Sequence, residues 1–176
     1  MRRDTYGNNY RISLRGTAWN TAIEKLGCIF KTRTNYMIYM LALSIGIMYD
    51  KREDRLPVED GEEVRSVPRN VIRNNDQGKL DFMFQAAILS TTTEEFSEEE
   101  RLDFAFGDKN DEKIGFKRID FLTQFANFGV TKLMEQIGET PIESMESIKN
   151  FLVSTVEGRN LEIDALPDDI LLEEDY

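Results

Sequence analysis

The sequence feature that most constrains the fold is an almost wholly apolar run of 14 residues at positions 36–49, interrupted by Ser44 and Gly46. This run is shorter than the roughly 20 residues that a helix needs to cross the hydrocarbon core of a membrane. Its apolar side chains go almost all the way round a helix that begins near Thr34 as its cap, and such a helix needs neighbours on every side. We therefore predict that this helix is central to the hydrophobic core.

The segment before this helix begins with a predicted strand. Apolar and polar residues alternate strictly over residues 10–15, which is the period of a half-buried strand. One face carries Tyr10, Ile12 and Leu14, and the other carries Arg11, Ser13 and Arg15. Gly16 and Thr17 break the strand and supply a helix cap, so that a pair of helices is predicted over residues 17–48. The order of strand, helix and helix is that of a ribbon-helix-helix unit, in which strands from two chains pair and enter the major groove of DNA.

The segment 50–75 has a different composition, with Pro57, Gly61 and Pro68 among charged residues and no sustained period. We predict a loop over these residues. A short hairpin over residues 58–64 is an option within it, because the pair Asp60-Gly61 favours a tight reversing turn.

Helical patterns resume over residues 78–157. Ser97 begins a capping box with Glu100, and Thr140 followed by Pro141 and Glu143 is the clearest helix start in the chain. In the long helix predicted from residue 116 onward, Gly129 allows another backbone to approach closely, and Asn127 is placed to hydrogen-bond across that contact. Core packing is the favoured role of the phenylalanines in this half of the chain: Phe82, Phe84, Phe104, Phe106, Phe116, Phe121, Phe125 and Phe128. The predicted fold is a mainly α-helical single domain, residues 1–157, with a short N-terminal strand and an acidic tail, residues 158–176.

The composition excludes several classes of enzyme. The chain has no histidine and a single cysteine, Cys28, which removes Ser-His-Asp triads, Cys-His dyads and the common zinc sites. Cys28 has no charged pair beside it and is predicted to be a small buried hydrophobe. Two groups of acids could hold Mg²⁺ in a nuclease, but both fall in the turn-rich loop: Asp50, Glu53 and Asp54, and Asp60, Glu62 and Glu63. We therefore expect no enzyme activity, no metal site and no cofactor.

Charge is distributed unevenly along the chain, whose formal net charge is −11. Residues 1–33 carry seven bases and two acids (7 − 2 = +5), whereas residues 157–176 carry eight acids and one base. In the tail, apolar residues alternate with acids, a pattern of segments that order against a basic groove on a partner or on the chain's own positive N-terminal region. The predicted partner-binding residues there are Leu166, Ile170, Leu171 and Leu172.

The basic N-terminal strand suggests a second kind of partner. Arg11, Ser13 and Arg15 share the outward face, and two arginines on a ribbon could each donate paired hydrogen bonds to guanine in duplex DNA. The alternative is an edge strand with ordinary solvated arginines, which blunt pairing between edges. The N-terminus turns polar where a signal peptide would need an apolar core, so we expect a cytoplasmic protein without a membrane segment.

Residues 30–137, or 108 of 176, resemble the small accessory proteins of bacterial Dnd systems, which place phosphorothioate in DNA or restrict DNA that lacks it. The resembling segments are Phe30-Lys31-Thr32-Arg33-Thr34-Asn35, Met40-Leu41-Ala42-Leu43-Ser44-Ile45-Gly46, Leu56-Pro57, Gly61-Glu62-Glu63, Ala86-Ala87 and, most specific, residues 119–129 ending in Phe125-Ala126-Asn127-Phe128-Gly129. The resemblance implies a small helical subunit in an anti-phage defence or DNA-modification operon, working beside an ATPase or nuclease of the SMC-like kind.

The expected function is therefore that of a non-enzymatic accessory subunit that binds a larger ATPase or nuclease subunit of the same operon. DNA, reached directly or through the complex, and a second copy of the chain are further expected partners. The alternative function is a ribbon-helix-helix-like DNA-binding protein or repressor that uses Arg11, Ser13 and Arg15. A carboxylate-metal nuclease is the third class, and it is the least favoured.

Overall fold

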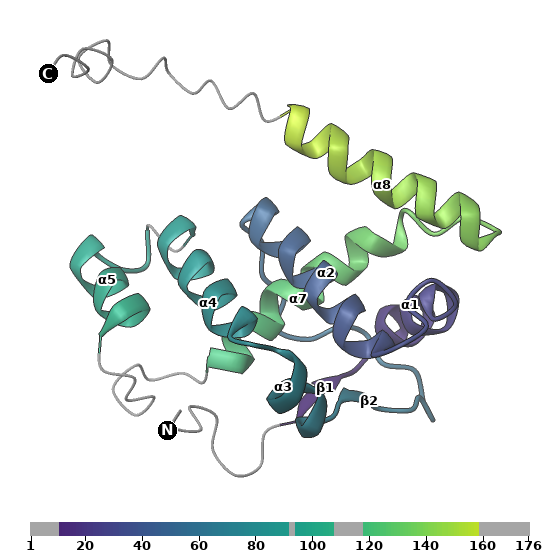
Figure 1. Ribbon diagram of the computed structural model, residues 1–176, viewed down its shortest axis with the longest axis horizontal. Coiled ribbons are helices and arrows are strands. Elements are labelled where there is room, and N and C mark those ends of the chain that lie inside the picture. The colour runs from purple at the N-terminus through teal and green to yellow at the C-terminus, as the bar shows by residue number, and fades with distance from the viewer. Residues whose placement is uncertain (1–10, 92–93, 108–117, 159–176) are drawn as a thin grey trace, which may run out of the picture.

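The computed structural model describes residues 11–91, 94–107 and 118–158, and these residues form a mainly helical domain (Figure 1). They contain seven helices and one short sheet of two strands, which confirms the predicted fold class. None of the helices in these ranges combines the length and the apolar character needed to span a membrane. The elements in chain order are β1 (Ile12–Leu14), α1 (Thr17–Leu26), α2 (Thr34–Tyr49), β2 (Arg65–Val67), α3 (Arg69–Asn75), α4 (Lys79–Ser90), α5 (Glu98–Phe106), α7 (Arg118–Met134) and α8 (Pro141–Gly158).

The centre of the domain is the crossing of α2 and α7, the most extensive helix pair of the described residues. A methyl group added at Gly46 of α2 would collide with the backbone of Phe125, and one added at Gly129 of α7 would collide with the carbonyl oxygen of Ala42. The two glycines therefore let the helix backbones touch. The prediction that the apolar helix is central and that Gly129 permits a close approach is confirmed.

The predicted N-terminal strand forms over Ile12–Leu14, and residues 11–15 alternate as expected, whereas Tyr10 lies outside the described residues. Ile12 and Leu14 are buried, whereas Arg11, Ser13 and Arg15 are exposed. β1 pairs antiparallel with β2 of the same chain, with Ser13 opposite Ser66. The order of strand, helix and helix agrees with a ribbon-helix-helix unit. The pairing of β1 differs, because in that unit the paired strand comes from a second chain.

The prediction of a continuous loop over residues 50–75 is wrong from Arg65 onward, because β2 and α3 lie there. Three and seven residues are too few to show a period in the sequence. Both elements depend on contacts with distant residues. β2 is held by its pairing with β1, and α3 leads into Asp76, which accepts a hydrogen bond from the hydroxyl of Tyr36 on α2 (2.9 Å).

The reversing turn at Asp60-Gly61 forms, but no hairpin follows from it. The backbone N–H of Glu62 donates to the carbonyl of Glu59 (3.1 Å), and Gly61 adopts a φ of 86°. Residues 58–64 contain no strand, because the strand that follows the turn pairs with β1 instead.

The helix starts agree with the sequence at two of the four predicted side-chain caps. At α1, Gly16 stands at the cap position without a side-chain hydrogen bond, and Thr17 is the first helical residue. Ser97 and Glu100 form the capping box of α5, and the backbone N–H of Glu143 donates to the hydroxyl of Thr140 at the start of α8 (3.2 Å). Thr34 is instead the first residue of α2. Its hydroxyl donates to the carbonyl of Phe30 (2.7 Å), and Arg33, with a left-handed backbone, stands at the cap position.

Candidate binding surfaces

Asn127 on α7 joins three parts of the chain beside the N-terminal strand. Its side-chain oxygen accepts a hydrogen bond from the indole N–H of the buried Trp19 on α1 (3.0 Å). Its amide nitrogen donates to the carbonyls of Glu53 (3.0 Å) and Asp54 (3.3 Å) in the loop after α2. Asn127 was predicted to hydrogen-bond across the close contact at Gly129, which the structure makes with α2, but its hydrogen bonds join α1 and the loop after α2 instead.

Beside Asn127 lies a hollow of about 440 Å³, which we call the β1 pocket. Its lining residues come from β1, the 54–58 loop and α7: Ser13, Arg15, Asp54, Arg55, Leu56, Val58, Thr123 and Asn127. Two of the three predicted DNA-binding residues, Ser13 and Arg15, thus line one pocket together with Arg55. Arg55 lies 40 residues further along the chain, so no local pattern could have connected it with Arg15.

Two guanidinium groups of the β1 pocket are available for a ligand. Within the described part of the chain, Arg15 and Arg55 have no ion-pair partner, and both are exposed. Arg52 in the same loop differs, because it pairs with Glu95 and lies over the ring of Phe121, 5.4 Å from its centroid. The pocket also contains one carboxylate, that of Asp54. The formal charge of the β1 pocket, +1, favours an anionic group such as a phosphate.

A second hollow, of about 450 Å³, lies along α8, and we call it the α8 groove. Seven of its eight lining residues are apolar, and the eighth is a lysine: Ile29, Phe30, Leu41, Met145, Ile148, Lys149, Leu152 and Val153. They come from the connection between α1 and α2, from α2 itself and from α8, which lies at the edge of the domain (Figure 1). Met145, Lys149 and Val153 follow one another at helical spacing and are exposed, so the wall of the groove on α8 is partly open to solvent.

The hairpin of α4 and α5 presents large apolar side chains to solvent. Gln85 on α4 donates to the carbonyl of Ala105 on α5 (3.0 Å), so the two helices lie side by side, as Figure 1 shows. Phe82 on α4 and Phe106 on α5 keep 66% and 65% of their surface exposed, and Leu102 keeps 45%. We call these three residues the α4–α5 face. The expectation that the phenylalanines pack in the core is wrong for Phe82 and Phe106, because the other elements leave their positions on α4 and α5 uncovered.

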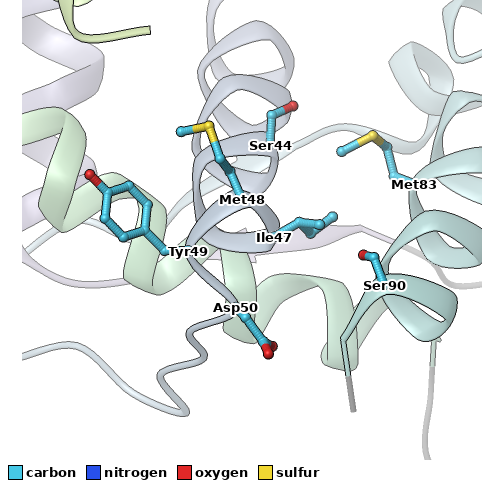
Figure 2. Close-up of a pocket in the computed structure, with 7 residues that line it drawn as sticks. All are labelled: Ser44, Ile47, Met48, Tyr49, Asp50, Met83 and Ser90. Carbon is cyan, nitrogen blue, oxygen red and sulfur yellow. The ribbon is translucent and has the colours of Figure 1, made fainter. Parts of the chain in front are cut away.

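A third pocket, of about 450 Å³, lies between the end of α2 and α4 (Figure 2). The hydroxyls of Ser44 and Ser90 both donate to carbonyls one turn earlier in their own helices (2.9 and 2.7 Å). Figure 2 shows the ring of Tyr49 directed away from the Ser90 side, and it stacks on Phe151 of α8 instead (6.3 Å between ring centroids). Asp50 supplies the one charged group of the lining. These polar groups do not converge on one point, so we assign no chemistry to this pocket.

Cys28 is exposed, so its prediction as a buried hydrophobe is wrong. Its thiol lies 3.4 Å from the carbonyl oxygen of Lys25, in the turn that follows α1. The inward positions of this turn are taken by Ile29 and Phe30, which pack against the core. The larger apolar side chains gain more from burial, which leaves the small thiol outside.

The acids weighed as metal ligands come from the loop after α2. Over residues 11–91, 94–107 and 118–158, no group of three or more His, Cys, Asp or Glu side chains is arranged to hold a metal ion. Asp54 contributes to the β1 pocket, whereas Asp60 belongs to the exposed turn.

The predicted partner-binding residues of the tail, Leu166, Ile170, Leu171 and Leu172, lie outside the described residues. Comparisons of the chain with protein-family models, with curated proteins and with solved structures give no match.

Proposed function

We propose that this chain is a non-enzymatic accessory subunit of a bacterial anti-phage defence or DNA-modification complex, and that it binds a larger ATPase or nuclease subunit, of the SMC-like kind, in the cytoplasm. The resemblance over residues 30–137 supports the assignment to such a complex. The observation that carries the proposal is the α4–α5 face, which leaves two phenylalanine rings and a leucine side chain in contact with water. Exposed aromatic residues on neighbouring elements are typical of protein–protein contacts.

The charges around the α4–α5 face indicate the chemistry of the partner. Residues 94–107 contain six acids and one base, Arg101, for a local charge of 1 − 6 = −5. Arg101 is already engaged, because it donates to the carbonyl of Leu89 on α4 (3.0 Å). The complementary surface would therefore offer apolar pockets for Phe82 and Phe106 within a basic rim. The same acids repel the phosphates of DNA, so this face favours a protein over a nucleic acid.

Co-purification with the products of the neighbouring genes tests this proposal. We expect the tagged chain to recover an ATPase or nuclease subunit, and we expect Phe82→Ser together with Phe106→Ser to reduce that recovery sharply. Ile142→Ser is the matched control, because Ile142 on α8 is also 65% exposed but belongs to a different face. Recovery of the chain alone, or undiminished recovery with the double variant, would refute the proposal.

A DNA-binding protein or repressor is the second candidate, and the β1 pocket favours it. Arg15 and Arg55, which have no ion-pair partner among the described residues, line it together with Ser13, and Arg11 is exposed directly before β1. Such a set can hold a phosphate of the backbone and place the strand against a groove. The net charge of −11 opposes strong binding, so we expect a weak interaction that depends steeply on salt.

Fluorescence anisotropy with a labelled duplex tests the second candidate. Arg11→Ala with Arg15→Ala should weaken binding and lower the slope of log affinity against log salt by about 0.9 for each phosphate contact that is lost. Lys79→Ala with Lys149→Ala removes the same two charges from exposed positions on α4 and α8 and serves as the control. Equal affinities for the double variant and the unaltered chain would remove this candidate.

A further inference from the structure

The α8 groove suits an apolar segment of polypeptide. Its volume of about 450 Å³ falls in the range of ordinary ligand pockets, roughly 300–1,000 Å³, but those pockets contain several polar groups that orient a ligand. The α8 groove contains a single polar side chain, that of Lys149. A row of aliphatic side chains would bury the exposed faces of Met145 and Val153, which the domain itself leaves in contact with water.

The surroundings of the α8 groove are positively charged on the side opposite α8. Residues 25–37, which include the lining residues Ile29 and Phe30, contain three bases and no acid. These bases are Lys25, Lys31 and Arg33, and all three are exposed. On α8 itself, Glu143, Glu146 and Glu157 outnumber Lys149, so the positive field comes from the connection between α1 and α2. A segment that combines aliphatic residues with acids would match both properties of the groove.

The chain contains such a segment directly after α8. Residues 159–176 carry seven acids and one base, for a charge of 1 − 7 = −6. Between the acids lie the aliphatic residues Leu161, Ile163, Leu166, Ile170, Leu171 and Leu172. We propose that this C-terminal segment turns back at the end of α8 and docks in the α8 groove of its own chain, with its aliphatic side chains on the apolar lining and its carboxylates facing Lys31, Arg33 and Lys149.

The reach of the segment is sufficient for this contact. Met145 lies 13 residues before Gly158, the last residue of α8, which is about 20 Å along the helix axis at 1.5 Å per residue. The 18 residues that follow can span up to about 60 Å when extended at 3.3 Å per residue. The tether also gives the segment an effective concentration in the millimolar range, so a weak contact is enough to fill the groove.

A second copy of the chain is a less suitable occupant. Two chains that each carry a net charge of −11 repel one another, and a contact between copies lacks the advantage of the tether. The intramolecular contact also goes beyond the proposed function, because it requires no other protein.

The native cysteine allows this contact to be measured in the full-length chain. Cys28 is the single cysteine, is exposed and precedes Ile29 of the groove lining. A nitroxide spin label on Cys28 would broaden the amide signals of any residue held near the groove in the NMR spectrum of isotope-labelled protein. We expect the signals of residues 161–172 to lose intensity, and to recover it when the nitroxide is reduced.

Two variants on α8 separate docking from general attraction. Met145→Glu places an acid in the groove, and we expect it to abolish the loss of tail signal. Ile142→Glu makes the same change of charge one turn earlier, outside the lining, and we expect the loss to persist. Tail signals that are unaffected by the label in the unaltered chain, or that respond equally to both variants, would overturn the proposal.

A mixing experiment distinguishes the second copy. Spin-labelled protein without isotopes is added to isotope-labelled protein without the spin label, so that only contacts between chains broaden the tail signals. We expect no broadening in this mixture. Broadening as strong as in the doubly labelled chain would assign the groove to a second copy and overturn the intramolecular contact. Neither experiment includes the partner subunit, so their failure is distinct from a failure of the co-purification.

Discussion

Replacement of Asn127 by alanine should destabilise the domain more than any substitution of an exposed asparagine. The change removes the acceptor of the Trp19 indole N–H and the donor to the carbonyls of Glu53 and Asp54. Trp19 is fully buried, so water cannot replace its partner, and an unsatisfied buried donor costs about 1–3 kcal/mol. The two carbonyls are only partly buried and can be hydrated, so they add about 1 kcal/mol together.

The total for Asn127→Ala is therefore about 2–4 kcal/mol, a large part of the 5–15 kcal/mol typical of a whole domain. With a denaturant slope of about 2 kcal/mol per molar urea, the midpoint of unfolding should fall by about 1–2 M. Trp19 is the single tryptophan of the chain, so its fluorescence follows the unfolding of this site directly. Asn150→Ala on the exposed surface of α8 is the control, and we expect it to change stability by less than about 0.5 kcal/mol.

Asn127→Asp distinguishes the two kinds of hydrogen bond that Asn127 makes. Aspartate still accepts a bond from Trp19, but in place of the amide donor it presents an oxygen to the carbonyls of Glu53 and Asp54. At neutral pH the variant should therefore be destabilised, and the difference from the unaltered chain should shrink as pH falls and the carboxyl group gains a proton that it can donate. An Asn127→Ala variant that loses less than about 0.5 kcal/mol, or an aspartate variant of unaltered stability at neutral pH, would refute the assigned hydrogen bonds.

Three further predictions concern packing, titration and capping. Gly129→Ala should lower the free energy of unfolding in urea by about 1–3 kcal/mol, because its methyl group would collide with the backbone of α2. Gly78→Ala is the control, because Gly78 has a φ of 87° and nothing within 4 Å of an added methyl group, so it should cost only about 1 kcal/mol of backbone strain. A larger loss of stability for Gly78→Ala than for Gly129→Ala would contradict the helix crossing. Burial raises the pKa of Tyr36 and Tyr39 above 10, the pKa of tyrosine in the unfolded chain. The folded state, which favours the neutral hydroxyls, therefore keeps its full stability below pH 10 and loses stability as pH rises through the raised pKa values of the folded state. Urea midpoints should therefore fall above about pH 10, and Tyr39→Phe should make that fall less steep; an unchanged slope would count against the burial of this hydroxyl. Thr140→Ala should destabilise the first turn of α8 by about 1 kcal/mol, because it removes the side-chain cap. Hydrogen exchange should then be faster for the amides of this turn and unchanged in α2 and α7. Equally faster exchange in all helices would argue against a local cap.

Patterns between near neighbours were sufficient to predict most of the helices of this protein. The apolar run that forms α2 had to be central, because a helix without a polar face is stable only inside a core. The capping box at Ser97 and the cap at Thr140 depend on residues three positions apart, and both are found in the structure. The alternation over residues 10–15 likewise placed Arg11 and Arg15 on the exposed face of β1.

Contacts between distant residues required the tertiary structure. β1 pairs with β2, more than 50 positions along the chain, and this pairing is the reason that the predicted loop contains a strand. Arg15 and Arg55 share a pocket because the tertiary structure brings β1 next to the 54–58 loop. The α8 groove likewise combines residues near position 30 with residues near position 150.

Burial was the property that local patterns predicted least well. Phe82 and Phe106 were expected to pack in the core like the other phenylalanines, yet the positions they occupy on α4 and α5 are left uncovered and both rings are exposed. Cys28 is outside because Ile29 and Phe30 take the inward positions of its turn. Periodicity determines which residues share a face of a helix, whereas the packing of other elements decides how much of that face is covered, and the surfaces proposed for binding are the parts left uncovered.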